Sequence, residues 1–437
     1  MRGRSAILLI IFFSVFTSCK KDPVITEVTP AMARDTLYYI MKQWYYWYDK
    51  MPSVTKENYE DPYLLLEALR YKTYDRWSFV ADYDEFLAEI EGTFVGHGFR
   101  IGVDKDQNAR IAMIFNKSPL YSEGVRRGWI VKKINDVDIA PILIAGDGTA
   151  YSNLIGPATA GVTNTFLFQR PDGSEVTISS TKKSFTINSV IMYDTLHLST
   201  GITGHMVLES FINPTPDELK TAFAFFQSCN VTSFILDLRY NTGGFLSGAQ
   251  SLASYLAGNN LASQVFAKLQ YNNKNQNSNY SFTYKTTSYG LNLPKVIVIT
   301  TRSTASASEA VINGLRSFLD VICIGDTTNG KPTGMNGWPC AKKYYFWPVT
   351  FKIVNASDEG DYFDGFAPDQ LATDDITHDF NDRNEQCLKQ AISYLQTGAF
   401  TGKGTDRFIR SIQISEKPAW MSNAFGTVVR EYQRIEE

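Results

Sequence analysis

The stretch that decides the fold lies at residues 234–244, with the sequence FILDLRYNTGG. Its first half is an apolar run of strand length, and its second half is a polar loop that ends in two glycines. The same order recurs twice, since VIVIT at 296–300 precedes the loop TRSTASASE, and VICIG at 321–325 precedes DTTNGKPTG. Helix-periodic apolar residues follow the first two loops. This β-α-β alternation predicts a parallel sheet covered by helices on both faces.

The loops after these strands carry the residues best placed for chemistry. Carboxyl ends of parallel strands meet at one edge of a sheet, where ligands bind in open α/β folds. Ser306 lies where the second loop turns into a helix, so free N–H groups at the helix start point into the same space. A serine hydroxyl needs a base, and Lys331 of the third loop can act as one if burial keeps it neutral. The four histidines and the lack of a Gly-x-Ser-x-Gly elbow indicate no histidine-based triad.

Together, these loops resemble the active-site loops of the carboxyl-terminal processing, or tail-specific, peptidases, which are serine/lysine enzymes. The family patterns LDLRxNxGG, SASE and GxxTxGK are all present, in the family's order along the chain. The resemblance implies that Ser306 is the nucleophile and that Lys331 is the general base. It also implies a ClpP/crotonase-like α/β peptidase core, with no metal and no organic cofactor.

An oxyanion hole is expected beside Ser306. The N–H of Ala307, together with that of Gly243 or Gly244, is placed to stabilise a negative oxygen. Glycine suits this position because the backbone must approach the substrate closely. The sequence does not choose between the two glycines.

The residue that orients Lys331 also stays open between Glu309 and Asp326. Glu309 matches a position where some family members place a supporting acid. Other members carry that acid further along the helix, where this chain has Ser317. His205 lies in an apolar run and is predicted to be structural.

Residues 93–185 resemble a PDZ domain. Two predicted strands at 98–103 and 109–115 precede a short helix at SPLYSEGV, and a hairpin follows at 166–179. Such a fold binds a peptide as an added strand, and N–H groups of a glycine-bearing loop receive its terminal carboxylate. The candidate peptide-binding loop consists of Gly98, Phe99, Arg100, Ile101 and Gly102. The expected partner is the C-terminal tail of a protein or peptide substrate.

The first residues have the features of an export signal. Arg2 and Arg4 precede an apolar run at 6–15, which is too short for a bilayer that needs about twenty residues. The run ends in FTSC, which resembles the lipobox of bacterial lipoproteins. The resemblance implies lipidation of Cys19 and an exported protein held to a bacterial membrane, on its periplasmic or surface face.

Composition excludes some classes of function. Lys and Arg total 42 against 45 Asp and Glu, a net charge of −3, and this balance gives no electrostatic reason to expect nucleic acid as the partner. The four histidines are not spaced like metal ligands. Four cysteines follow Cys19 and allow three disulfide pairings, among which spacing does not choose. Cys323 lies in a strand-like run and is predicted to be a buried free thiol.

Apolar and aromatic residues at helical spacing predict helices in the N-terminal region. The first is expected to open at Asp35 or Thr36 and to stop at Pro52, and the second to span 63–71.

The sequence therefore predicts a multidomain α+β protein. Its segments are a signal peptide (1–19), a tether with a helical segment (20–92), a PDZ-like domain (93–185), a peptidase core (186–402) and a C-terminal extension (403–437). The predicted function is serine endopeptidase activity on exported proteins. The alternatives are an inactive peptide-binding lipoprotein with a peptidase-like core, and acyl-CoA chemistry on a crotonase-like fold.

Overall fold

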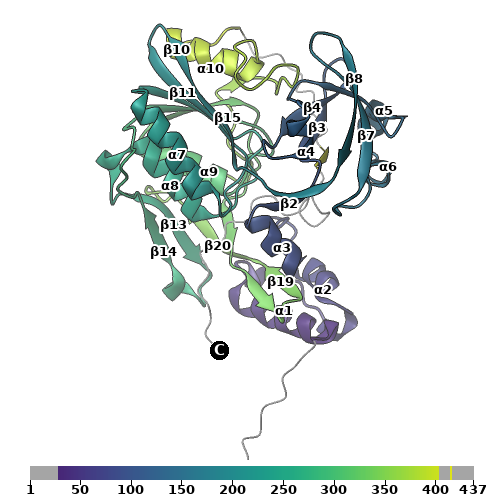
Figure 1. The fold of residues 1–437 in the computed structure, drawn as a ribbon. Helices are drawn as coiled ribbons and strands as arrows, with labels where there is room; N and C mark the ends of the chain where they lie inside the picture. Colours follow the sequence, from purple (N-terminus) through teal and green to yellow (C-terminus); the bar gives the residue numbers. More distant parts are fainter. Residues whose placement is uncertain (1–27, 403–413, 416–437) are drawn as a thin grey trace, which may run out of the picture.

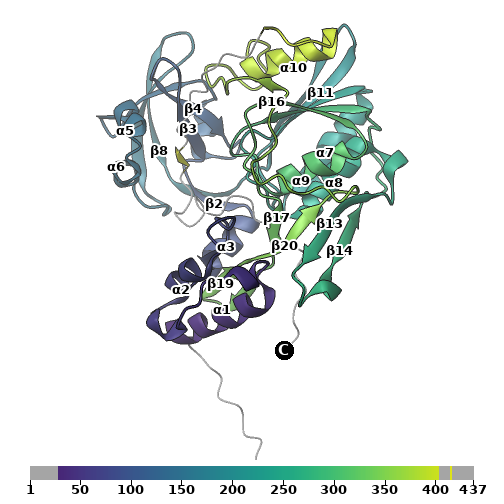
Figure 2. The same cartoon turned by 180° about the vertical axis from the view of Figure 1, so that it is seen from behind.

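The computed structural model describes residues 28–402 and 414–415. Figure 1 shows a helical N-terminal part, a β-rich domain and a larger α/β core that contacts both. The prediction of a mixed α+β architecture with an N-terminal helical region is confirmed. Seen from behind in Figure 2, helices α7, α8 and α9 gather on one side of the core, and α10 lies on the other.

The core is built on a six-stranded sheet in the order β10-β11-β12-β15-β16-β21. The strands from β11 to β21 run parallel, and β10 pairs antiparallel with β11. The three apolar runs found in the sequence form adjacent strands, so the loops that follow them meet at one edge. The strands are β10 (Val190–Leu198), β11 (Gly201–Leu208), β12 (Ser233–Asp237), β15 (Lys295–Thr300), β16 (Asp320–Gly325) and β21 (Gln370–Leu371).

Helices cover both faces of this sheet, as the sequence predicts. Phe234 and Leu236 of β12 pack in the cluster formed by α7, α8 and α9, whereas Ile235 faces α10. This alternation follows from the two-residue period of a strand. The helices are α7 (Thr215–Ser228), α8 (Leu246–Ala257), α9 (Ala307–Arg316) and α10 (Gln386–Thr397).

A second sheet extends the core toward the N-terminal part, with the order β14-β13-β20-β17. The Asn-rich stretch 272–279 joins β13 to β14 as the predicted hairpin tip. It also makes an unpredicted contact, because Asn272 is buried and donates to the carbonyls of Gln43 and Tyr45, each at 3.0 Å. The strands are β13 (Val265–Tyr271), β14 (Tyr280–Thr283), β17 (Thr333–Met335) and β20 (Val349–Val354).

The helical N-terminal part begins earlier than predicted. The helix start at Asp35 or Thr36 is wrong, because the Thr29 side chain caps α1 by accepting from the N–H of Met32. Proline fits the first helical turn, which Pro30 occupies. The elements here are α1 (Pro30–Trp44), α2 (Pro62–Leu69), β1 (Phe79–Asp82) and α3 (Tyr83–Ile90).

A strand from the core completes this N-terminal part. β1 pairs antiparallel with β19 (Tyr344–Trp347), which also pairs with β18 (Trp338–Cys340). Figure 1 shows β19 lying beside α1, α2 and α3. Trp77 and Trp347 are both buried in the shared apolar cluster. The N-terminal part is therefore not one continuous segment of chain.

The β-rich domain carries a sheet in the order β22-β3-β4-β5-β7-β8, with β6 beside β5. A two-stranded ribbon of β2 and β9 joins it to the core, where the sequence predicts boundaries at 93 and 185. At the open edge, β22 pairs antiparallel with β3, with Ile414 opposite Ile101. The elements are β2 (Thr93–Gly96), β3 (Phe99–Val103), β4 (Ala109–Ile114), α4 (Pro119–Ser122), β5 (Ile130–Ile134), β6 (Val137–Asp138), α5 (Ile139–Ala145), α6 (Gly148–Ile155), β7 (Thr163–Gln169), β8 (Glu175–Thr181), β9 (Lys183–Thr186) and β22 (Ile414–Ser415).

The cysteines of the described residues are free thiols: Cys229, Cys323, Cys340 and Cys387. Cys323 is buried, as predicted. Among residues 28–402, no helix is both long and apolar enough to span a bilayer. The predicted signal segment and Cys19 lie outside the described residues.

Candidate active site

Three loops converge at the carboxyl ends of β12, β15 and β16. The N–H of Ala305 donates to the Asn241 carbonyl (3.1 Å), and the N–H of Asn329 donates to the Thr304 carbonyl (2.9 Å). The Thr304 hydroxyl also donates to the Leu238 carbonyl at 2.8 Å. The sequence therefore predicted correctly which three loops come together.

Ser306 sits at the turn from the second loop into α9, with an unusual backbone. Its φ of 57° and ψ of −110° are disfavoured for a residue with a side chain, and such strain is common at functional sites. The residue is fully buried. Within the part of the chain that the structure describes, its Oγ has no hydrogen-bond partner. Ser306 is also the N-cap of α9, with Glu309 at the capping-box position, and a buried hydroxyl that makes no hydrogen bond of its own costs free energy.

Glu309 joins the serine loop to the lysine loop. One carboxylate oxygen, Oε2, accepts from the N–H groups of Ser306 (2.9 Å) and Lys331 (2.8 Å). The other oxygen accepts from the Gly330 N–H and the Thr328 hydroxyl, each at 2.6 Å. Burial raises the pKa of Glu309, and these donors oppose the rise. All four neighbours donate to this carboxylate, and such donors favour its ionised form.

Lys331 is fully buried beside this carboxylate. Burial lowers the pKa of its amine well below the ordinary value, while the charges of Asp75 and Glu309 oppose that shift. A lowered pKa increases the fraction of neutral amine at neutral pH, which is what a general base requires.

The N–H groups of the two glycines differ in their hydrogen bonds. The Gly243 N–H donates to Asn241 Oδ1 at 2.9 Å and is therefore already used. Among the backbone hydrogen bonds of the described residues, none is donated by the N–H of Gly244 or of Ala307. Position 244 also demands glycine, because its φ is 128° and a Cβ would lie 2.1 Å from the Phe211 carbonyl oxygen.

Asp326 and His205 lie in other environments. The Asp326 carboxylate accepts from the Thr327 N–H at 2.7 Å and lies 3.9 Å from the Arg302 guanidinium. His205 is buried in β11, and its Nδ1 lies 3.3 Å from Asn381 Oδ1. These contacts favour Glu309 over Asp326 as the acid of the lysine loop, and they fit the structural role predicted for His205.

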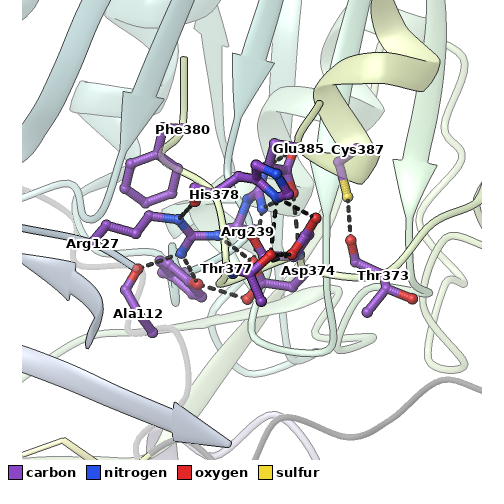
Figure 3. A network of polar contacts seen from close by, with 12 residues as sticks. Ala112, Arg127, Arg239, Thr373, Asp374, Thr377, His378, Phe380, Glu385 and Cys387 are labelled. Carbon is purple, nitrogen blue, oxygen red and sulfur yellow. Dashed lines mark hydrogen bonds and ion pairs between the residues drawn. The ribbon is translucent and has the colours of Figure 1, made fainter. Parts of the chain in front are cut away.

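A buried network of ion pairs holds the first loop in place through Arg239. The Arg239 guanidinium contacts the carboxylates of Asp237 (2.7 Å), Asp374 (2.8 Å) and Glu385 (2.8 Å). Figure 3 shows Arg127, from the β-rich domain, converging on Asp374 from the other side, at 2.9 Å. Sequence reasoning missed this network, because its members are far apart in the chain.

The network also shifts the acidity of Asp374. Burial alone would raise the pKa of this carboxyl, but Arg127, Arg239 and the Tyr240 hydroxyl lower it to about 2. Arg127 additionally donates to the Tyr240 hydroxyl at 2.7 Å. The β-rich domain is thereby fixed to the loop that carries the glycine pair.

Most of the predicted peptide-binding loop is a strand: Phe99 to Gly102 belong to β3, and Gly98 directly precedes it. Gly98 has a φ of 77°, and a Cβ there would lie 2.3 Å from Ser118 Cβ, so packing alone already requires glycine. The Arg100 guanidinium points to the core, where it pairs with Glu209. Phe99 and Ile101 are buried in the domain's own apolar cluster. A peptide at this edge would bind through the β3 backbone, where β22 already pairs.

Comparisons with known proteins agree with this geometry. Residues 202–371 match the model of peptidase family S41, and residues 33–79 match that of the peptidase S41 N-terminal domain. The chain is 22% identical over 263 residues to the carboxy-terminal processing protease CtpB of Bacillus subtilis, an alignment that covers 58% of this chain and 50% of that protein. It is 23% identical over 252 residues to a protein of Staphylococcus saprophyticus named as a CtpA-like serine protease, covering 56% and 46%.

One solved structure supports the fold itself. A structure from Bacteroides fragilis NCTC 9343, named as an S41 protease, superposes with a TM-score of 0.70 at 24% identity, covering 82% of this chain and 96% of that one. The chain spans about half the length of the curated relatives it matches. It therefore carries the two domains of peptidase family S41, the peptidase domain at residues 202–371 and the N-terminal domain at residues 33–79.

Proposed function

We propose that the protein is a serine endopeptidase of the carboxyl-terminal processing type, with Ser306 as nucleophile and Lys331 as general base. The observation that carries the proposal is the Glu309 carboxylate, which accepts from the backbone N–H groups of a buried serine and a buried lysine in two neighbouring loops. A binding protein has no need for that pair. The match of residues 202–371 to the model of peptidase family S41 supports the same class of reaction.

The proposed reaction begins when Ser306 Oγ attacks a peptide carbonyl and its proton passes to the Lys331 amine. The carbonyl electron pair moves onto oxygen, where the N–H groups of Gly244 and Ala307 are placed to stabilise it. The Lys331 ammonium then donates its proton to the departing amine as the C–N bond breaks. Water hydrolyses the resulting acyl-enzyme by the same steps in reverse order.

The experiment compares the parent with Ser306→Ala and Lys331→Met on an unfolded protein that has an apolar C-terminus, with fragments followed by mass spectrometry. Ser303→Ala and Lys342→Met are the matched controls, because Ser303 lies in the same loop and Lys342 is exposed. Cleavage by the parent and both controls, but by neither site variant, is the expected result. Cleavage by Ser306→Ala at the parent's rate would exclude the proposed nucleophile.

The β-rich domain is proposed to bind the substrate's C-terminal tail in the manner of a PDZ domain. Only the two-residue strand β22 lies outside β3 in this sheet, so most of the β3 backbone is placed where peptides are added as strands. Amidation of the substrate's C-terminus is expected to weaken binding, because it removes the carboxylate. An inactive parent that still binds the tail would favour the alternative of a peptide-binding lipoprotein.

Location at the cell envelope, through a lipid on Cys19, also belongs to the proposal. Its support is the short apolar run that ends in FTSC. Globomycin treatment of cells that produce the full chain, followed by mass spectrometry of its N-terminus, tests it. A mature protein that begins elsewhere than at Cys19 in untreated cells would contradict lipidation, and so would cleavage that continues unchanged in treated cells.

A further inference from the structure

The N-terminal part reaches the lysine loop directly. The Arg76 guanidinium donates to the Asn329 carbonyl at 2.7 Å, and Trp77 Nε1 donates to Asn329 Oδ1 at 3.3 Å. Asn329 in turn donates through its backbone N–H to Thr304 in the serine loop. Arg76 and Trp77 therefore contact a residue that lies two positions before Lys331 and is bonded to the serine loop.

Trp77 also faces the amine itself. Lys331 Nζ lies 5.8 Å from the centroid of the Trp77 ring, within the range of a cation–π contact. Both residues are almost completely buried, so little water screens the interaction. The Arg76 guanidinium lies over the same ring, 4.7 Å from its centroid.

The segment that presents this ring is held rigidly. Asp75 is buried, and its Oδ1 accepts from the N–H groups of Trp77 (3.0 Å) and Ser78 (2.9 Å). Its Oδ2 accepts from the hydroxyls of Tyr45 (2.8 Å) and Ser78 (2.6 Å). These bonds fix the turn that places Trp77, and they also hold a negative charge near the lysine loop.

We propose that Trp77 is a positioning residue for Lys331, whose ring orients the amine and stabilises the ammonium that forms when the amine takes a proton. This rests on the proposed function, in which that proton comes from Ser306. Burial favours the neutral amine before the reaction, and the ring offsets part of the penalty once the charge appears. The N-terminal domain would thus be part of the catalytic site.

Other charges act on the same amine. Asp75 and Glu309 both favour the ammonium, whereas burial disfavours it, and Arg76 competes for the Trp77 ring. A test must therefore alter the ring without altering these groups. Biosynthetic incorporation of fluorinated tryptophan does so, because fluorine withdraws electrons from the ring face while the indole N–H and the ring shape remain.

The experiment measures the titration of Lys331 by NMR of lysine labelled with carbon-13 at Cε. The Lys331 signal is assigned by its absence from Lys331→Met. In the fluorinated protein the titration midpoint is expected to fall by roughly 0.4 to 1.5 pH units, and kcat by roughly 2- to 30-fold. Trp77→Phe is expected to shift the midpoint in the same direction, and fluorination is expected to cause no further shift in that variant.

Trp347→Phe is the matched control, because Trp347 is equally buried in the same cluster. It is expected to leave the midpoint unchanged. A midpoint that stays constant or rises on fluorination would overturn the proposal, and so would an equal shift in Trp347→Phe. The absence of peptidase activity would refute the proposed function alone. Because the titration needs no substrate, its midpoint would still decide the role of Trp77.

Discussion

The substitution Glu309→Gln is expected to destabilise the protein and to slow cleavage. The carboxylate accepts from Ser306 and Lys331 on one oxygen and from Gly330 and Thr328 on the other. A glutamine amide has one acceptor oxygen and one donor NH2 group. The less costly orientation turns the NH2 toward Gly330 and Thr328, because the Thr328 hydroxyl can rotate and accept.

The magnitude follows from these contacts. One buried N–H, that of Gly330, is left without an acceptor, which costs about 1–3 kcal/mol. The bonds to Ser306 and Lys331 become neutral and weaken by roughly 1 kcal/mol each. Removal of a buried charge offsets part of this, so the free energy of unfolding is expected to fall by about 2–4 kcal/mol. A displacement of the two reacting residues by about 1 Å is expected to lower kcat by roughly 100-fold.

Urea unfolding and peptide cleavage measure the two effects separately. Glu218→Gln is the matched control, because Glu218 Oε2 also accepts three hydrogen bonds, from Ser189 N, Ser189 Oγ and Val190 N. It is expected to lower stability while leaving kcat unchanged. Glu309→Gln with a free energy of unfolding within about 0.5 kcal/mol of the parent and an unchanged kcat would refute the reasoning.

Three further predictions concern acid stability and the β3 edge. Arg127 and Arg239 lower the pKa of Asp374 from 3.8 to about 2, so this carboxyl takes up a proton at higher pH in the unfolded chain than in the folded one. About 2–3 kcal/mol of the free energy of unfolding is therefore expected to be lost as pH falls from 4 to 2. Asp374→Asn should flatten this part of a profile of urea unfolding against pH. Burial lowers the pKa of His97 from 6.5 to about 4, so the unfolded chain binds a proton first and about 3 kcal/mol of the free energy of unfolding is lost as pH falls from 6.5 to 4. If His97→Gln lost stability equally steeply over this pH range, His97 would not be the cause. Removal of residues 403–437 deletes β22 and is expected to tighten the binding of an apolar C-terminal peptide roughly tenfold, as measured by fluorescence anisotropy. An unchanged affinity would show that β22 does not compete with the peptide for β3.

The central sheet and its three loops were predictable because the signal is local. Continuous apolar runs followed by polar loops define buried parallel strands, and their order alone brings Ser306 and Lys331 to one edge. The sequence could not show which of the two glycine N–H groups is left without an acceptor. That depends on which N–H the Asn241 side chain takes, a detail of one turn's geometry.

The contribution of the N-terminal part could not be predicted from local pattern. Trp77 and Asn329 are 252 positions apart, and their contact depends on how two parts of the protein pack. The completion of the N-terminal part by β19 is likewise a tertiary event, since Tyr344–Trp347 has only the features of an ordinary strand in the sequence. The early start of α1 was missed because the aromatic stripe, and not the cap at Thr29, defined the predicted helix.

The backbone conformation at position 306 lowers stability at the residue that the proposed chemistry needs. A φ of 57° with a ψ of −110° costs a residue with a side chain about 1–3 kcal/mol, and glycine avoids most of that strain. Ser306→Gly is therefore expected to give a more stable protein that lacks the proposed nucleophile. Threonine also has a hydroxyl, but its β-branch would strain this position further. A screen for thermostability alone would thus favour the inactive residue at this position, so engineering of this chain needs a selection for turnover alongside one for folding.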